Sequence, residues 1–362
     1  MPILKNILLS VFTGASAMVA AATVAVAYSD RLDPIAHPVL ACAGMVFPIF
    51  LVANLVVLLL WLMVKWRRVW IPIAAFVLAF PSIRIFMPLH TSSEAPAGCI
   101  KVLSYNVAAY GGNYRYNQAM DTIFGYLKQQ KADIVCFQED MTVKFNPVEH
   151  FPELYPYNDT VHVTPPGYPL INAVGIHSRF PIIRRERISY ESLANGSVAF
   201  FLQIGADTVI VVNNHLESTH LSTDDRQRYK AMMRGDMDRA STKEETRLIL
   251  DKLSKAMAQR AEQAKAVSRY IEQHRGYPLI VCGDFNDTPI SYVRRTIAQG
   301  LTDCYVDTGN GLGLSYNQRG FNFRIDHIMC SSHFKPYNCY VDDKMDASDH
   351  YPIICWLERS NM

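Results

Sequence analysis

The stretch Gly283-Asp284-Phe285-Asn286-Asp287 follows the apolar run Tyr277–Cys282. The run predicts a buried strand, and Gly283 marks its end. Asp284 and Asn286 are two residues apart, a spacing that puts both side chains on the same side of an extended chain. A carboxylate and an amide at the end of a core strand could meet a metal-bound phosphate, although an Asp/Asn turn after a strand is also a common structural feature.

Five more stretches place polar or acidic residues at the end of an apolar, strand-like run, or just beyond it. They are Leu103–Val107, Asp133–Glu139, Val212–Ser218, Arg324–Ile328 and Ala347–Pro352. In this order, the six stretches resemble the motifs of the endonuclease/exonuclease/phosphatase family, which includes pancreatic-type deoxyribonuclease, abasic-site endonucleases, neutral sphingomyelinases and inositol-polyphosphate 5-phosphatases. The resemblance covers about residues 98–359. It implies an α+β fold, a four-layer αββα sandwich, and metal-dependent hydrolysis of phosphoric esters.

The resemblance also implies roles for individual residues. Asp284 would orient or deprotonate the attacking water, and Asn286 would bind a phosphate oxygen or help to hold the metal. His350 would polarise the phosphoryl group, with Asp326 as the carboxylate that holds its ring and raises its pKa. His215 matches a second position that contacts phosphate. The expected catalytic residues are therefore Asp284, His350, His215, Asp326 and Asn286.

The motifs also indicate where the metal binds. Hydrolysis of a phosphate ester needs a cation that neutralises the phosphoryl oxygens, and hard divalent ions prefer carboxylate oxygen. Glu139 is the main ligand candidate, and Asn106 supports the metal or fixes Glu139. Asp349 is a further ligand or a hydrogen-bond acceptor beside the metal. The expected cofactor is Mg²⁺, with Mn²⁺ as an alternative.

Apolar runs and helical periodicity outline the rest of this domain. Besides the strands in the motifs, we expect a helix over 117–130, a strand over 173–176, a hairpin of 197–204 and 208–214, and a final strand over 353–357. Two more helices are expected over 224–234 and 243–274, and a loop over 145–169. In the strand 323–330, His327 should face away from the site, because neighbouring strand residues point to opposite sides.

The first part of the chain is much more apolar than the rest. The runs Ile7–Tyr28 and Val39–Val64 are long enough to cross a bilayer. A signal peptide is the competing interpretation of the first run, and the long second run favours retention. The third run, Val69–Met87, is interrupted by prolines and could be tilted or re-entrant. We expect a membrane anchor of three transmembrane helices over 1–90, a linker over 91–98 and the catalytic domain over 99–362.

Positive charges indicate the orientation of the anchor. Lys65-Trp66-Arg67-Arg68 lies between the second and third runs and should be cytoplasmic, in agreement with Lys5 before the first run. With three crossings, the catalytic domain lies on the outer side, periplasmic or extracellular, of an inner or plasma membrane. If the third run does not cross, the catalytic domain is cytoplasmic.

The charge of the catalytic domain bears on its substrate. Residues before 98 hold six basic and three acidic residues, so the totals of 35 and 33 leave 29 basic and 30 acidic residues. A domain that binds long nucleic acid usually has a basic excess. The substrate is therefore open between a lipid headgroup or small phosphodiester and a nucleic acid, as for a nuclease or DNA-end-processing phosphodiesterase. His215-Leu216-Glu217-Ser218-Thr219 is similar to the tyrosyl-DNA phosphodiesterase branch. A third alternative is a membrane binding module without catalysis.

Overall fold

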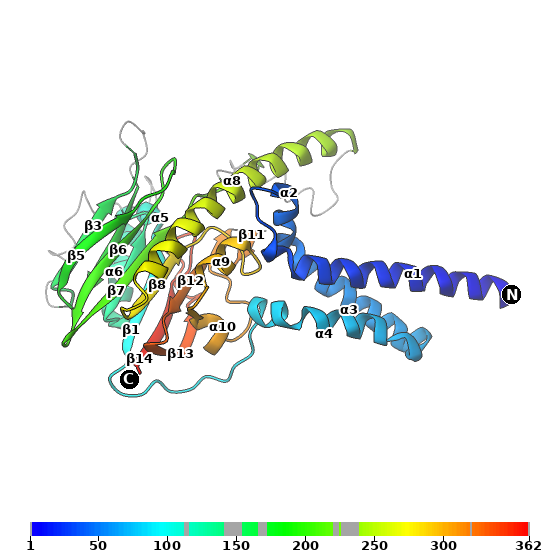
Figure 1. The fold of residues 1–362 in the computed structure, drawn as a ribbon, viewed down its shortest axis with the longest axis horizontal. Coiled ribbons are helices and arrows are strands. Elements are labelled where there is room, and N and C mark those ends of the chain that lie inside the picture. The colour runs from blue at the N-terminus through cyan, green and yellow to red at the C-terminus, as the bar shows by residue number, and fades with distance from the viewer. Residues whose placement is uncertain are drawn as a thin grey trace.

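The computed structural model describes residues 2–111, 116–140, 154–165, 172–219, 224–225, 239–318 and 321–360. Two six-stranded sheets pack face to face, and helices cover their outer faces (Figure 1). Apolar helices project from one end of this sandwich. The α+β, four-layer αββα fold preceded by three apolar helices is therefore confirmed.

The first sheet carries the N-terminal motifs. Its strands are β1 (Ile100–Asn106), β2 (Ile134–Gln138), β3 (Tyr157–His162), β4 (Ala173–Ser178), β13 (Phe334–Val341) and β14 (Ile353–Arg359), in the order β13-β14-β1-β2-β4-β3. Strand β1 runs parallel to β2, so the polar residues after both strands meet at one edge. The short helix α5 (Ala108–Gly111) follows β1. Helix α6 (Tyr116–Gln130) covers the outer face, where its Ile123 and Leu127 pack against Leu103 and Val135.

The second sheet carries the remaining motifs except the last. Its strands are β5 (Ile182–Ile188), β6 (Gly196–Ile204), β7 (Asp207–His215), β8 (Leu279–Asp284), β9 (Thr302–Asp303) and β12 (Asp326–Cys330), in the order β5-β6-β7-β8-β12-β9. Helices α8 (Arg239–Gln273) and α9 (Tyr292–Ile297) cover its outer face, where Val267 and Ile297 pack against Val212 and Val281. The smaller elements are α10 (Cys304–Thr308) and the hairpin β10 (Tyr316–Gln318)–β11 (Phe321–Phe323).

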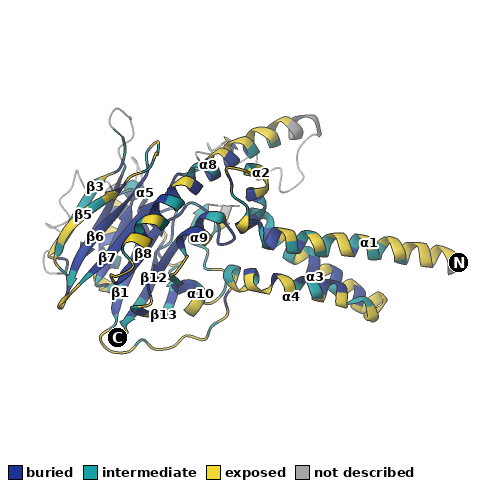
Figure 2. Cartoon of the chain, in the orientation of Figure 1, coloured by how far each residue is buried: buried dark blue, intermediate teal, exposed yellow. Residues whose placement is uncertain are grey.

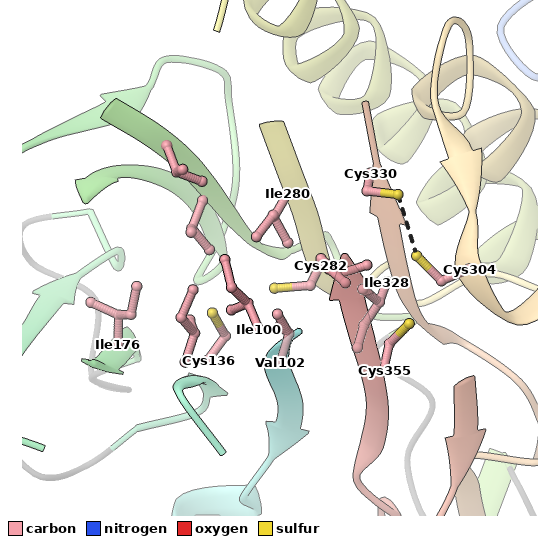
Figure 3. Close-up of a cluster of buried hydrophobic side chains, with 14 of the residues drawn as sticks. Ile100, Val102, Cys136, Ile176, Ile280, Cys282, Cys304, Ile328, Cys330 and Cys355 are labelled. Carbon is pink, nitrogen blue, oxygen red and sulfur yellow. Dashed lines mark hydrogen bonds between the residues drawn. The ribbon is translucent and has the colours of Figure 1, made fainter. Parts of the chain in front are cut away.

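The core between the sheets consists of side chains from the inner faces of both (Figure 3). Val102 and Cys136 from the first sheet share one cluster with Ile280, Cys282 and Ile328 from the second. Each fully buried aliphatic side chain of this kind stabilises a fold by about 1.5–3 kcal/mol. This core holds the strand ends of the two sheets in a constant relative position.

Most of the predicted elements are present, and the misses are strands at the margins of the sheets and the short elements α9, α10 and β10–β11. The segment 145–169 was expected to be a loop, but its described part contains β3. Strand β3 was missed because it lies at a sheet edge and its residues are polar and only partly buried. Strand β5 was missed for the same reason, since its central residues are charged. The helix expected over 224–234 lies almost entirely outside the described residues.

The N-terminal part forms three helical segments that are long and apolar enough to cross a membrane: Ile3–Arg31, Pro38–Val64 and Trp66–Phe86. They comprise α1 (Pro2–Ala27), α2 (Pro38–Ala41), α3 (Phe47–Val64) and α4 (Trp70–Phe86), and much of their apolar surface is exposed (Figure 2). The second segment was expected to be a single helix. It is interrupted instead, because the 3₁₀ turn Cys42–Val46 separates α2 from α3. Helix α4 continues through Pro81.

Polar contacts attach these helices to the sandwich. Lys265 Nζ lies 3.0 Å from Asp33 Oδ2, and Arg295 Nη1 lies 3.4 Å from Asp30 Oδ2. The buried guanidinium of Arg324 donates to the carbonyl oxygens of Ile85 and Phe86, at the end of α4 where helical carbonyls lack partners. The apolar helices and the sandwich are thus joined at several points rather than by the connecting segment 87–99 alone.

Candidate active site

The polar residues of the six motifs meet at one end of the sandwich, where strands of both sheets end. Parallel pairing places the end of β1 beside that of β2, and His215 at the end of β7 beside Asp284 at the end of β8. Antiparallel pairing sets Asp326, the first residue of β12, opposite Asp284. A cavity of about 200 Å³ is lined there by Glu139, His215, Asp284, Asn286, Asp349 and His350. Asn106 and Asp326 reach the same group through hydrogen bonds.

Asp284 lies at the centre of this cluster. Its Oδ1 accepts a hydrogen bond of 2.8 Å from the Asn286 backbone N–H, and its Oδ2 accepts from the side-chain amides of Asn106 (3.1 Å) and Asn286 (3.3 Å). Burial raises the pKa of Asp284 to about 7, against the lowering effect of the nearby His350. A carboxylate with such a pKa can exchange a proton near neutral pH.

His350 and Asp326 form a tight pair. His350 Nδ1 lies 2.8 Å from Asp326 Oδ2, and His350 Nε2 lies 3.6 Å from Asp284 Oδ2. Burial lowers the pKa of His350, but the carboxylates of Asp326 and Asp284 outweigh this effect and raise it to about 10. The ring is therefore an imidazolium at neutral pH, held by Asp326 with Nε2–H directed at the cluster.

His215 approaches the same carboxylate from the other side. Its Nε2 lies 3.7 Å from Asp284 Oδ2 and 3.8 Å from Glu139 Oε1. Its Nδ1 lies 3.1 Å from Asn172 Nδ2, and an amide nitrogen can only donate, so Nδ1 accepts. The neutral ring then carries its proton on Nε2, which faces the carboxylates. Asn172 was not expected from the sequence, because it lies in a connecting segment without a motif.

The residues proposed as metal ligands suit a hard divalent cation. Glu139 Oε1 accepts a 3.3 Å hydrogen bond from Asn106 Nδ2, and the same amide reaches Asp284. Confinement in the cavity raises the pKa of Glu139, and the nearby Asp349 carboxylate adds to this rise. Crowded carboxylates with raised pKa values favour a neutralising cation, and their oxygens are the donors that Mg²⁺ and Mn²⁺ prefer. The cluster therefore fits the expected metal.

A second group of candidate metal ligands consists of Asp284, Asp326 and His350. One ligand atom each of Asp284, Asp326 and His350 lies within 4.8 Å of the others. His350 Nδ1 and Asp326 Oδ2, however, are already bonded to each other. This geometry is typical of a histidine oriented by a carboxylate, so Glu139 and Asn106 remain the better ligand candidates.

Arg260 is a residue at this site to which the motifs assigned no role. It lines the cavity, is fully buried on α8, and its Nε lies 3.4 Å from Asp287 Oδ2. Its Nη1 donates to the Glu217 carbonyl oxygen, while Nη2 has no hydrogen-bond partner within the described part of the chain. A buried guanidinium with an unused donor is suited to bind an anionic oxygen. No local pattern in the long helix distinguishes Arg260 from its other basic residues.

His327 faces away from the cavity, as expected. It is fully buried, its Nδ1 lies 3.8 Å from Asp303 Oδ2, and its ring packs against Phe285. Burial lowers the pKa of His327 to about 4, so it is neutral at physiological pH. Asp326 and His327 thus point to opposite faces of one strand.

Comparisons with known proteins agree with this geometry. The sequence model of the Endonuclease/Exonuclease/phosphatase family matches residues 103–350, and that of a domain of unknown function matches residues 9–86. None of the curated protein sequences matches the chain.

Several solved structures share the fold. The human Nocturnin catalytic domain with bound sulfate has 16% identity and a TM-score of 0.51, covering 72% of this chain and 95% of that one. Humanized D. rerio TDP2 has 15% identity and a TM-score of 0.50, covering 72% and 99%. A family protein from Bacteroides thetaiotaomicron has 18% identity and a TM-score of 0.50, covering 72% and 97%. The chain belongs to the endonuclease/exonuclease/phosphatase family and is a metal-dependent phosphoric ester hydrolase.

Proposed function

We propose that this chain is a membrane-anchored hydrolase of phosphodiesters or phosphomonoesters, dependent on Mg²⁺ or Mn²⁺, in which water attacks phosphorus. The observation that carries the proposal is the convergence of Asp284 with two histidines and two amides at the strand ends. Asp284 Oδ2 lies within 3.7 Å of His215 Nε2 and His350 Nε2. A carboxylate between two N–H donors is suited to a reaction in which water loses a proton while negative charge grows on phosphoryl oxygen.

Asp284 acts as the general base in this proposal. With a pKa of about 7, it is substantially ionised at neutral pH and basic enough to take a proton from water. Asn106 and Asn286 fix its carboxylate through hydrogen bonds, so the accepting oxygen is held before the substrate arrives. Such preorganisation lowers the cost of reaching the transition state.

His350 and His215 stabilise the phosphoryl oxygens. The Asp326 carboxylate keeps His350 protonated, so its Nε2–H presents a full positive charge to the substrate. His215 presents a neutral N–H, because Asn172 occupies its other nitrogen. Asn286 and Arg260 supply further donors at the cavity wall. Hydrogen-bond donors fixed at a site of growing negative charge accelerate such reactions.

Glu139 would hold the divalent ion, with Asn106 and Asp349 as supporting oxygen donors. When bound, such an ion neutralises phosphoryl charge and orients the substrate. Asn106 fixes Glu139 through its amide, and Asp349 adds negative charge that strengthens the attraction for a cation.

The test uses the full chain in detergent micelles with bis(p-nitrophenyl) phosphate, DNA, RNA, inositol phosphates and phospholipids. We expect turnover of at least one of these esters, lost in EDTA and restored by Mg²⁺ or Mn²⁺. Turnover that persists in EDTA would contradict the role of the metal. Absence of turnover on every ester with either ion would instead support a membrane binding module without catalysis.

We also propose that the catalytic domain lies outside an inner or plasma membrane. The N-terminus and the turn between α3 and α4 lie together at the end of the anchor remote from the sandwich (Figure 1). That end holds Lys5, Lys65, Arg67 and Arg68, and cytoplasmic loops carry an excess of such residues. Three spans then place the catalytic domain on the opposite side.

Thiol labelling measures this orientation. Trp66 in the turn and Ser93 in the linker are both exposed, and Cys99 is the only described cysteine that is not buried. In a Cys99→Ser background, Ser93→Cys should react with a membrane-impermeant maleimide on cells with an intact plasma membrane. Trp66→Cys should react only after that membrane is permeabilised. The reverse pattern would contradict the three-span orientation.

A further inference from the structure

The active-site cavity is not built from the catalytic domain alone. Beside the polar residues it is lined by Leu253, Met257, Phe323, Ile325 and Met45, and Met45 belongs to the second apolar segment of the anchor. A purely polar phosphate ester would gain little from such a wall. The wall therefore indicates that the substrate has an apolar part.

Packing fixes the position of Met45. Ala41 and Cys42 from the anchor form one apolar cluster with Ile249, Leu253 and Met257 of α8. Met45, Tyr316 and Phe323 pack alongside this cluster. The adjacent Gly44 approaches the backbone of the catalytic domain so closely that a Cβ there would overlap the Ile290 carbonyl oxygen. The start of the second segment thus forms part of the cavity wall rather than lying near it by chance.

The length of this segment places Met45 at the membrane surface. Pro38–Val64 has 27 residues, whereas about 20 residues cross the hydrocarbon core. Val64 directly precedes the positive residues expected at the far surface. Counting about 20 residues back from Val64 brings the near edge of the hydrocarbon to Met45. The cavity therefore lies at the depth at which bilayer lipids carry their phosphate groups.

Exposed apolar side chains also lie on α2 and α8, the two helices that contribute to this wall and its surroundings. Val39 and Leu40 of α2 are 55% and 58% exposed, and Leu248 of α8 is 52% exposed. Helix α2 lies beside α8 at the end of the sandwich from which the anchor projects (Figure 1). Val39 and Leu248 line a separate groove, most of whose other side chains are polar or charged.

We infer that the substrate is a phospholipid of the surrounding bilayer, hydrolysed at the level of its headgroup. This inference rests on the proposed hydrolase function. Water adds to phosphorus while Asp284 takes one of its protons. The P–O bond to an alcohol breaks, the departing alkoxide takes up a proton from solvent, and Asp284 later returns its proton to solvent. The near-neutral charge of residues after 98, 29 basic against 30 acidic, does not favour a nucleic acid.

The test compares a lipid with an ester that has no tail. The full chain is reconstituted into vesicles of phosphatidylcholine, phosphatidylethanolamine, phosphatidylglycerol and sphingomyelin, and release of water-soluble phosphorus or headgroup is measured. Met45→Gln keeps the length of the side chain but makes it polar. It should raise KM for the lipid about tenfold. The KM for bis(p-nitrophenyl) phosphate should rise much less than the KM for the lipid, and Met45→Leu should behave like wild type.

Met63→Gln is the matched control, because Met63 lies at the far end of the same segment and is 85% exposed. This variant should leave both activities unchanged. An equal effect of Met45→Gln on both substrates would show that Met45 only supports the fold. Faster cleavage of a DNA or RNA oligonucleotide than of any vesicle lipid would overturn the inference, as would hydrolysis of the tail-less ester alone. If neither lipid nor any other ester is hydrolysed with metal present, the proposed function itself fails.

Discussion

Asp284→Asn should lower kcat by about 10²–10⁴-fold, the range that a general base usually contributes. The amide cannot accept a proton from water, although it has nearly the same shape as the carboxylate. Asp284 accepts hydrogen bonds from the Asn106 amide and the Asn286 backbone, so an asparagine would also disturb this arrangement. The measurement is initial rates on bis(p-nitrophenyl) phosphate at saturating Mg²⁺, with thermal unfolding to monitor the fold.

Asp303→Asn is the matched control for a buried carboxylate in the same sheet. Asp303 Oδ2 accepts hydrogen bonds of 2.9 and 2.8 Å from Arg294 and does not line the cavity. Its loss should reduce the free energy of unfolding, because it leaves a buried guanidinium without its partner. The kcat of the folded protein should stay near that of wild type. An Asp284→Asn variant with wild-type kcat would remove Asp284 from the proposed mechanism.

The elements that could be predicted from sequence are those whose burial requires a recognisable run of apolar residues. All the described residues of β2 and β8 are buried, and both strands appear as short apolar runs. Strand β3 has no such pattern, because among the described strands it pairs with β4 only and its residues are exposed or partly buried. Edge strands depend on the backbone of their neighbour more than on their own side chains.

The residues of the candidate site also divide into those that the sequence pattern indicates and those that it does not. Asp284 and Glu139 lie directly at strand ends, where the sequence marks them by a change from apolar to polar residues. Arg260 and Asn172 come from a long helix and a connecting segment. Only the packing of the chain brings Arg260 to the cavity wall and Asn172 to His215. Met45 is the extreme case, since an apolar residue in an apolar segment carries no signal of a role in a site.

The N-terminal apolar helices also have a structural role that composition alone does not indicate. Hydropathy predicts membrane crossing, but it does not predict that Arg324 would bind the last carbonyls of α4. Arg324 precedes Asp326 by two residues, so the end of the anchor and the partner of His350 belong to one short stretch. The position of the apolar helices and the geometry of the site are therefore mechanically connected.

His350→Gln should lower kcat by about 10²–10³-fold, because it removes a fixed positive donor at the phosphoryl oxygens. Asp326→Asn should have a smaller effect, since an amide oxygen can still accept from Nδ1 but does not hold the ring in its charged form. Asp326 touches the reaction only through His350, so it is a positioning residue. In a His350→Gln background, Asp326→Asn should therefore cause little further loss of kcat.

The four kcat values of this double-mutant cycle show whether Asp326 acts through His350 or independently of it. Residues that act as a unit have strongly non-additive effects on kcat. The control cycle pairs His350→Gln with Asp303→Asn, whose side chain bonds to Arg294 instead. Asp303→Asn alone should leave kcat near that of wild type, so it should also change kcat little in the His350→Gln background. If the Asp326 and His350 losses multiply, Asp326 must act on the substrate or the metal directly. The three-residue group of Asp284, Asp326 and His350 would then be the better candidate for the metal site.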